Sequence, residues 1–354
     1  MQNLTCQPLL RDLVPDQFAA LAAEFDVPAY RSHQLREWAL KHGALAWDDM
    51  ANVPRALREA AARRFDLRGL EVRERQVSRD GTRKFLFATR DGNTIESVII
   101  PMAEHVTFCL STQVGCAMAC TFCATARGGL VRNLSPGEII EQILHLRRDL
   151  AAEPVPGRGD RQHNVVFMGM GEPLDNWEGL APALESMLHP DGLGMSRRRV
   201  QVSTSGPAAG LRQLIAANPG VGLTLSLGGS TDEERRRIMP VPGRTTLAEA
   251  IDLAAEYGRV AARRVTVAWV VIRERTDRPE QAERLARLLK GRHIKVNLIP
   301  WNPLDDSRLE AADEGAVLAF QAVLTGAGVP TFIRASGGRD IDAACGQLRR
   351  KRAS

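Results

Sequence analysis

The chain has 354 residues, of which 44% are hydrophobic and 25% are charged, so its composition is that of an ordinary globular protein. No apolar run approaches the roughly 20 residues that span a bilayer, and the N-terminus lacks the basic and then apolar layout of a secretory signal. We therefore expect a cytoplasmic protein with no membrane contact. The net charge of +5 fits a nucleic-acid partner, but it also fits many proteins that bind none.

Two short regions precede the main part of the chain. Residues from about 15 to 66 carry helical periodicity interrupted by Pro, Gly and Asp, which predicts a small helical domain over residues 1–66. The segment 67–104 has two Asp-Gly turn signals between β-branched or alternating runs, which predicts an antiparallel β connector. Basic residues of the helical domain are candidates for contacts with a nucleic-acid backbone, although exposed helix faces often carry such residues without a partner. They are Arg31, Arg36, Lys41, Arg63 and Arg64.

Residues 105–354 alternate between buried strands and amphipathic helices. The strand candidates are VTFCLST, NVVFMG, RVQVST, GLTLSL, VTVAWVVI and KVNLIP. Strands that alternate with helices in this way predict an α/β fold with a parallel sheet, here an incomplete (β/α)6 barrel of the TIM type. Ligands of such barrels lie at the carboxyl ends of the strands, so the residues of a functional site should follow the strands directly.

Three closely spaced cysteines, Cys116, Cys120 and Cys123, follow the first strand of the predicted barrel. This spacing is typical of a loop whose thiolates bind three irons of a 4Fe-4S cluster and leave the fourth iron free for a small molecule. A structural zinc ion would normally require a fourth Cys or His nearby, whereas His105 and His145 lie outside the loop. The sequence therefore favours iron–sulfur ligation over zinc.

Glycine-rich or polar segments lie at the carboxyl ends of four other strands. They are GMGEP (Gly169 to Pro173), STSG (Ser203 to Gly206), SLGG (Ser226 to Gly229) and NLIPWNP (Asn297 to Pro303). Each alone is consistent with an ordinary turn or cap. However, a glycine turn allows the backbone to approach a ligand, and the Glu172 carboxylate can accept a hydrogen bond from a cationic amine. Because all four segments lie at the carboxyl ends of strands, we expect them to line one site.

These motifs resemble the radical SAM superfamily, whose three-cysteine loop holds a 4Fe-4S cluster that binds S-adenosylmethionine. Their order, from VPAYRSHQLREWALKHG to DIDAACGQL, resembles the RlmN/Cfr group of RNA adenine methyltransferases over essentially the whole chain. The resemblance implies that Cys116, Cys120 and Cys123 are the cluster ligands. It also implies a set of residues that contact S-adenosylmethionine, which are Gly171, Glu172, Ser203, Ser226, Leu227, Gly228 and Asn297.

The resemblance further implies roles for two cysteines outside the loop. Cys345 in DAACGQL corresponds to the methyl-carrying cysteine, Cys109 in VTFCLST to the resolving cysteine, and Glu96 to an acidic proton acceptor. From the residues alone, a single Cys in an apolar strand is more often inert core, which is the assignment that Cys6 keeps. In the implied reaction two molecules of S-adenosylmethionine are used. One methylates Cys345, the other yields the radical that activates the S-methyl group, and a transient Cys109–Cys345 disulfide releases the product.

Two segments depart from the usual pattern of the group: Gly228 replaces a common histidine, and RASGGRDI (334–341) replaces RKTRGDDI. These departures concern substrate choice. The first hypothesis is methylation of carbon 2 of an adenine in 23S ribosomal RNA, with transfer RNA as a further substrate. Alternatives are carbon 8 of the ribosomal adenine, a paralogue with another RNA target, and a non-catalytic RNA-binding relative, which the intact cluster motif and Cys345 disfavour. We expect a monomer that receives electrons from a cytosolic donor such as flavodoxin or ferredoxin.

Overall fold

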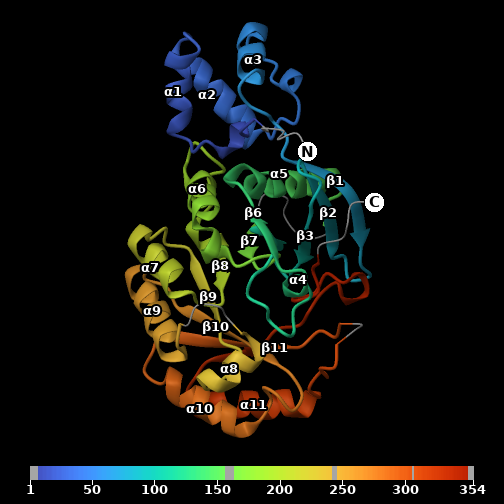
Figure 1. Ribbon diagram of the computed structural model, residues 1–354, viewed down its shortest axis with the longest axis vertical. Helices are drawn as coiled ribbons and strands as arrows, with labels where there is room; N and C mark the ends of the chain where they lie inside the picture. Colours follow the sequence, from blue (N-terminus) through green and yellow to red (C-terminus); the bar gives the residue numbers. More distant parts are fainter. Residues whose placement is uncertain (1–6, 156–162, 241–244, 305–306, 350–354) are drawn as a thin grey trace.

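The computed structural model describes residues 7–155, 163–240, 245–304 and 307–349. A helical lobe at the N-terminus lies beside an α/β body that contains the rest of the chain (Figure 1). The lobe contains α1 (Gln17–Glu24), α2 (Ala29–Arg36) and α3 (Arg55–Ala62), and α2 continues into a single π-helical turn, Glu37–Lys41. No helix in the described ranges is both long and apolar enough to cross a bilayer.

A buried arginine holds the helical lobe together. The Arg11 side chain is fully buried, and its guanidinium donates to the backbone carbonyls of Ala39, Ala44 and Leu67. Burial lowers the pKa of Arg11, whereas the carboxylate of Glu141 on α5 (Pro136–Ala152) raises it. Since a buried guanidinium is costly unless its donors are paired, this arrangement fixes the lobe against the β connector.

The described strands form one ten-stranded sheet and one two-stranded hairpin. In the large sheet β1 (Leu70–Val77), β2 (Arg83–Thr89), β3 (Thr94–Pro101) and β4 (Val106–Cys109) pair antiparallel. The remaining pairs are parallel, in the order β4, β7 (His163–Phe167), β8 (Val200–Thr204), β9 (Gly222–Ser226), β10 (Val265–Val271), β11 (Ile294–Pro300) and β12 (Thr331–Ile333). The β connector therefore extends the barrel sheet directly.

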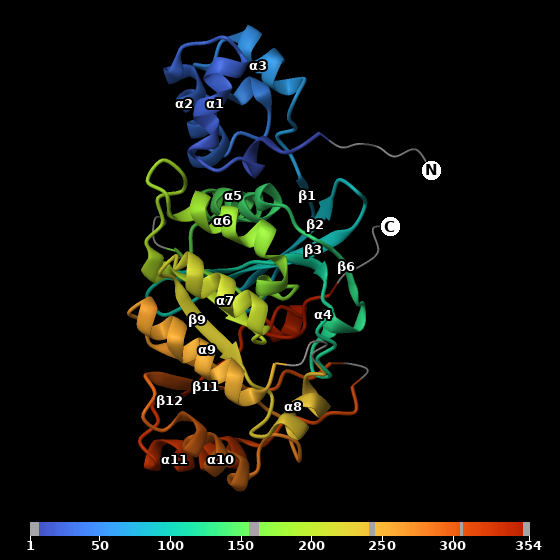
Figure 2. The ribbon, with the colours of Figure 1, turned by 60° about the vertical axis from the view of Figure 1, so that its left-hand side comes forward.

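Helices cover the outer face of the parallel strands (Figure 2). They are α5, α6 (Trp177–Leu188), α7 (Ala208–Ala217), α9 (Leu247–Val260), α10 (Pro279–Leu289) and α11 (Glu314–Gly326). Local sequence explains where α5 begins: Ser135 accepts a hydrogen bond from the Glu138 amide, and the Glu138 carboxylate accepts one from the Ser135 amide, which together form a capping box.

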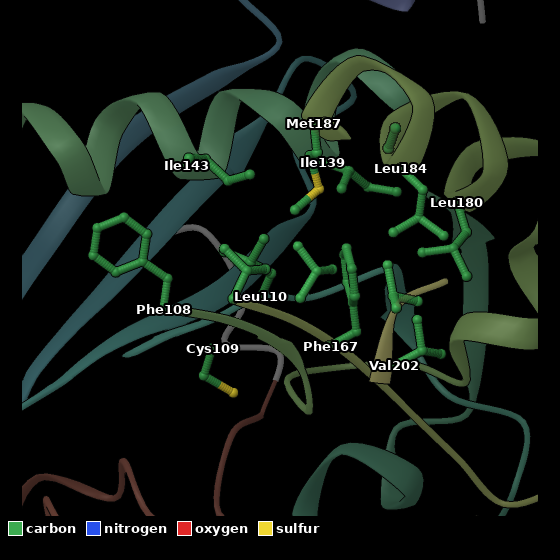
Figure 3. Packing of buried hydrophobic residues seen from close by; sticks show 14 of the residues in the cluster. Phe108, Cys109, Leu110, Ile139, Ile143, Phe167, Leu180, Leu184, Met187 and Val202 are labelled. Carbon is green, nitrogen blue, oxygen red and sulfur yellow. The ribbon is translucent and has the colours of Figure 1, made fainter. Parts of the chain in front are cut away.

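The core lies between these helices and the sheet. Phe108, Phe167 and Val202 point from β4, β7 and β8 toward Ile139 and Ile143 of α5 and the apolar face of α6 (Figure 3). Cys109 follows Phe108 on β4, and successive side chains of a strand alternate between faces. Its sulfur accordingly points to the opposite, inner face of the sheet (Figure 3).

The structure confirms the α/β class and the parallel barrel strands, and it adds elements that the sequence pattern did not indicate. These are β12, the hairpin of β5 (Gln113–Gly115) and β6 (Leu130–Asn133), the short helix α4 (Ala124–Arg127) and α8 (Asp232–Ile238). They are short or strongly charged, so they lack the long apolar period that identifies an element in a sequence. The domain boundaries at residues 66 and 104 stay a prediction.

Candidate active site

The three-cysteine loop spans the ends of the β5–β6 hairpin. The Cys116 amide donates to the Gly129 carbonyl at 3.0 Å, which closes the base of the loop. Gly115 has φ +82°, and a Cβ there would lie 1.9 Å from the Gly129 oxygen, so only glycine fits. The loop is held from the other side by the Thr121 amide, which donates to the Ile238 carbonyl at the end of α8.

The thiols of this loop suit a cluster better than a single ion. Cys116 is buried, whereas Cys120 and Cys123 are partly exposed. Burial raises the pKa of Cys116 to about 12, and burial together with the charges of Cys123 and Cys116 raises the pKa of Cys120. Bound iron would remove this cost, because it takes the thiolate form. No three described His, Cys, Asp or Glu side chains converge as ligands of one ion, and a 4Fe-4S cluster does not require it because each thiolate binds a different iron.

A cavity of about 90 Å³ brings together both cysteines from outside the loop. Cys109 from β4, Cys345 from the C-terminal segment and Asn297 of β11 line it. Further lining comes from Met168, Thr224 and Ala268 of the inner sheet face and from residues 334–337 and 343–344. Both partners of the expected exchange therefore line one cavity, and neither is joined to another described cysteine.

Hydrogen bonds dock the Cys345 segment against the cluster loop. The Ala124 amide donates to the Gly346 carbonyl at 2.7 Å, and the Thr125 hydroxyl donates to the Leu348 carbonyl at 2.6 Å. On the other side, Nδ2 of the buried Asn302 side chain donates to the Cys345 carbonyl at 3.1 Å. The methyl-carrier candidate is therefore attached directly to the helix that begins after the last cluster cysteine.

Asn302 was not singled out from the sequence, and its geometry makes it a positioning residue. Replacing Asn302 with alanine removes the bond to Cys345 and also the acceptor for Arg339 Nε at 3.1 Å. Loss of two such bonds at a buried site costs about 1–3 kcal/mol, so we expect methyl transfer to Cys345 to slow about tenfold at unchanged iron content. Intact-protein mass spectrometry measures this rate. Asn218→Gly, at an exposed helix end, is the control, and equal rates in the two variants would contradict the role.

The two thiols of the cavity differ in charge environment. Burial raises the pKa of Cys109 far above its ordinary value, and the charge of Cys345 raises it further. Desolvation by the surrounding atoms also raises the pKa of Cys345, although the residue as a whole is exposed, but the Arg334 guanidinium lowers it. Of the pair, Cys345 is therefore the better placed to react as a thiolate.

Strand register places the predicted polar residues on the face that lines this cavity. Ser203 pairs with Thr224, which lies two residues before Ser226 on β9. Ser226 pairs with Ala268, and Ala268 pairs with Asn297. Paired residues of parallel strands share a face, and Thr224, Ala268 and Asn297 line the cavity. Ser203 and Ser226 therefore project from the same inner face, at the carboxyl ends where the barrel rule expects a ligand.

Glu172 is buried and engaged by the protein's own donors. Its carboxylate accepts hydrogen bonds from the Thr204 hydroxyl at 2.6 Å and the Ser205 amide at 2.7 Å. Burial raises the pKa of Glu172, and these hydrogen bonds offset part of that rise. The preceding Gly171 has φ +107° and lies so close to Gln113 that a Cβ would be 2.7 Å away. These contacts shape the GMGEP turn, and the contact of Gly171 and Glu172 with S-adenosylmethionine stays a prediction.

Leu227 and Gly228 continue from β9 away from the cavity lining. The Leu227 side chain is fully buried, so only its backbone can approach a ligand. Gly228 has φ +70°, and Met239 Sδ would lie 2.5 Å from a Cβ at this position. Met239 thus fills the space into which a side chain at 228 would project, which gives the glycine at this position a local packing reason.

Gly228→Ala is expected to lower the free energy of unfolding by about 1–3 kcal/mol, because a non-glycine residue at positive φ is strained and its Cβ meets Met239. Denaturant unfolding measures the loss. In a Met239→Ala background the additional loss caused by Gly228→Ala should be smaller, because the steric conflict is absent. Met239→Ala alone measures the cost of truncating this buried side chain. Gly326→Ala, at the end of α11 with no atom within 4 Å of its Cβ, is the matched control. Equal stability of Gly228→Ala and the control would contradict the steric account.

Glu96 lies on β3, outside the set of residues that line the cavity. Its carboxylate is fully buried, 3.4 Å from Lys84 Nζ, and accepts the Arg349 amide at 2.9 Å. Lys84 Nζ also donates to the Asp342 carbonyl at 3.4 Å. The pair thus binds the C-terminal segment on both sides of Cys345. The role of Glu96 as a proton acceptor stays a prediction, and Lys84 is a second contact residue that the sequence pattern did not indicate.

Comparison with known proteins identifies the same family as the sequence motifs, and the similarity to individual relatives extends over nearly the whole chain. Residues 110–289 match the model of the radical SAM superfamily. A crystal structure of a radical SAM methyltransferase from Sphaerobacter thermophilus superposes with a TM-score of 0.90 at 36% identity, over 96% of this chain and 99% of that one. The dual-specificity RNA methyltransferase RlmN of Anaeromyxobacter dehalogenans is 44% identical over 96% of this chain and 91% of its own length. The probable RlmN of Symbiobacterium thermophilum is 41% identical over 95% and 90%, respectively.

The chain belongs to the RlmN family of radical SAM enzymes. A 4Fe-4S cluster and S-adenosylmethionine are the cofactors of that superfamily. The assignment of Cys116, Cys120 and Cys123 as the cluster ligands stays a prediction. Segment 334–341, whose sequence differs from the usual pattern of the family, contributes to the cavity lining through Arg334, Ala335, Ser336 and Gly337. This difference from the family pattern therefore lies beside the reactive thiols.

The basic residues of the N-terminal lobe have internal partners in several cases. Arg36 is buried and pairs with Asp191 at 3.1 Å, so it is not part of an exposed helix face. Arg64 pairs with Glu24 at 2.5 Å, and Arg31 donates to the side chain of Gln34. Lys41 is exposed, with Glu37 3.9 Å away. Cys6 lies outside the described residues.

Proposed function

We propose that this protein methylates carbon 2 of an adenine in RNA, with 23S ribosomal RNA as the first candidate substrate and transfer RNA as the second. The observation that carries the proposal is the shared cavity of Cys109 and Cys345 beside the cluster loop. The names of the relatives, which describe RNA methyltransferases of dual specificity, support the substrate class.

The chemistry of the target explains why two cysteines are needed. The carbon between two adenine nitrogens is electron-poor, so it does not attack a methyl sulfonium directly. When bound, the cluster and two molecules of S-adenosylmethionine supply one methyl group and one 5'-deoxyadenosyl radical. The Cys345 thiolate takes the methyl group by displacement, and loss of one hydrogen atom from that methyl leaves a carbon radical on the Cys345 side chain. Addition to adenine joins protein and RNA covalently.

Release requires Cys109. The radical adduct loses one electron to an oxidised one-electron carrier of the flavodoxin or ferredoxin class, and it loses the ring proton to a base, for which Glu96 is the candidate. The Cys109 thiolate then attacks the Cys345 sulfur, the S–S bond forms, and the bond from sulfur to the methylene carbon breaks, so that carbon departs with the electron pair and is protonated. A cytosolic dithiol donor restores both thiols, while a flavodoxin or ferredoxin supplies electrons to the cluster.

The test is nucleoside mass spectrometry after incubation of anaerobically reconstituted protein with methyl-labelled S-adenosylmethionine and unmodified ribosomal or transfer RNA. Label in 2-methyladenosine is the expected result. Label in 8-methyladenosine would overturn the assignment of the carbon and support the alternative target position. Cofactor cleavage with no labelled RNA would overturn the proposed substrate, and an RNA complex without any cofactor cleavage would point to a non-catalytic relative.

A further inference from the structure

A second cavity lies between the helical lobe and α5, and its charged lining is entirely basic. Its volume is about 230 Å³, which is space for several water molecules at roughly 30 Å³ each. Lys41 and His42 line it from the end of the π-helical turn, and Arg147 and Arg148 line it from α5. Figures 1 and 2 both show α5 directly beneath the lobe.

The loop geometry builds this cavity. Gly43 has φ +64°, so the chain turns sharply after His42, and a Cβ at Gly43 would lie 3.4 Å from Leu144 on α5. The lobe thus touches α5 next to the two arginines. Lys41, His42 and Arg148 are exposed, so the cavity is open to solvent.

The positive charge at the inner wall is not neutralised within the described part of the chain. Arg147 is half-buried, and burial alone lowers its pKa, with no carboxylate opposing the shift. Its Nε donates to His163 Nε2 at 3.3 Å. That histidine is neutral at physiological pH, because burial and the charges of Arg147 and Arg199 lower its pKa to about 3. A partly desolvated guanidinium without a counter-charge is costly.

The nearby carboxylates are engaged elsewhere. Asp149 pairs with Arg75 and Arg83, and Asp191 pairs with Arg36. Among the described residues no carboxylate pairs with Arg148, and the nearest approach to Lys41 is the exposed Glu37 at 3.9 Å. An anion from outside would therefore relieve the unbalanced charge of the cavity.

We propose that this basic cavity binds a backbone phosphodiester of the RNA substrate, at the opposite edge of the sheet from the cysteine cavity. The proposal rests on the proposed function, because it takes the anion to be RNA. The placement supports it: Arg147 contacts His163, the first residue of β7, whereas Met168 in the cysteine cavity follows the last residue of the same strand. A phosphate held here contacts the substrate remotely from the reacting adenine. Guanidinium groups and a lysine are suited to phosphate.

The experiment measures RNA affinity of the full-length reconstituted protein across a salt series, using unmodified ribosomal and transfer RNA transcripts. Lys41→Gln/Arg148→Gln should weaken binding about tenfold at 0.1 M salt, and the slope of log affinity against log salt should fall by about 0.7–0.9 for each phosphate lost. Arg212→Gln/Arg287→Gln removes the same charge from exposed positions on α7 and α10 and is the matched control. Adding Arg147→Gln should weaken binding further.

Two readouts separate this proposal from the proposed function. Methylation of Cys345 without RNA should be equal in the wild type and the variants, because the cavity is remote from the thiols. Wild-type protein that neither binds nor methylates RNA would refute the proposed function. If the wild type binds and methylates RNA but the cavity variant equals the control in RNA affinity and salt slope, the phosphodiester site would be overturned. Stabilisation of the wild type by inorganic phosphate with RNA affinity unaffected by the variant would overturn it as well.

Discussion

Replacing Cys345 with alanine is expected to reduce labelled methyladenosine to background while cleavage of S-adenosylmethionine continues. The physical reason is that alanine has no thiolate to accept a methyl group, whereas the predicted cluster ligands Cys116, Cys120 and Cys123 are unchanged. Cys345 is exposed, so its loss should alter the free energy of unfolding by only about 0.5 kcal/mol or less. The measurement combines nucleoside mass spectrometry with chromatography of 5'-deoxyadenosine.

The controls for this variant separate chemistry from folding. Cys6→Ala removes a cysteine for which no role is proposed, and it should retain full labelling. Iron content of the Cys345→Ala protein should equal that of the wild type. Labelled RNA from Cys345→Ala would contradict the methyl-carrier role, and a simultaneous loss of iron would assign the defect to the docking of Cys345 on the cluster loop, since Ala124 donates to Gly346.

The sequence was sufficient for the fold class because the barrel strands are long apolar runs that alternate with amphipathic helices. Each of the six expected strands is present and lies in the order of the chain. The short elements around the site were not predictable in this way. The β5–β6 hairpin depends on the close approach of Gly115 to Gly129, and that approach is a tertiary contact between residues far apart in the loop.

The candidate site likewise contains residues that the sequence could predict and residues that it could not. Strand-end motifs predicted that the segments of Asn297, Ser203 and Ser226 line one site. Strand register places these three residues on one face of the sheet. Asn302 and Lys84 could not be found from spacing, because their contacts with the C-terminal segment join residues more than 40 positions apart. What pattern cannot reveal is how the segment that carries Cys345 is held.

The role of Arg334 could be predicted only in part from the sequence. It is the first residue of segment 334–341, which differs from the family pattern, and the sequence identified that segment as a place where substrate choice could change. Only the structure places Arg334 in the same cavity as Cys345, where its charge lowers the pKa of that thiol. A charged residue near a reactive cysteine is recognisable once the fold brings the two together.

Cys109→Ala is expected to accumulate a covalent complex of protein and RNA that withstands denaturing electrophoresis. Without the resolving thiol, the adduct on Cys345 has no nucleophile to attack its sulfur, so free methylated RNA should fall to a small fraction of the wild-type yield. Nuclease digestion followed by mass spectrometry should then find an adenine-derived mass on the Cys345 peptide. The double variant Cys109→Ala/Cys345→Ala should show no adduct, and an adduct in that protein would contradict attachment through Cys345.

The wild-type enzyme should show the same dependence on Cys109 as a pH effect. Burial raises the pKa of Cys109 far above neutrality, and this effect persists in the adduct, in which the alkylated Cys345 carries no charge. Below that pKa the thiolate fraction grows about tenfold for each pH unit. Release of preformed adduct should therefore accelerate as pH rises from 7 to 9, measured by rapid quench and denaturing gels. If release were independent of pH over this range, deprotonation of Cys109 would not limit it, and another step of the release would control the rate.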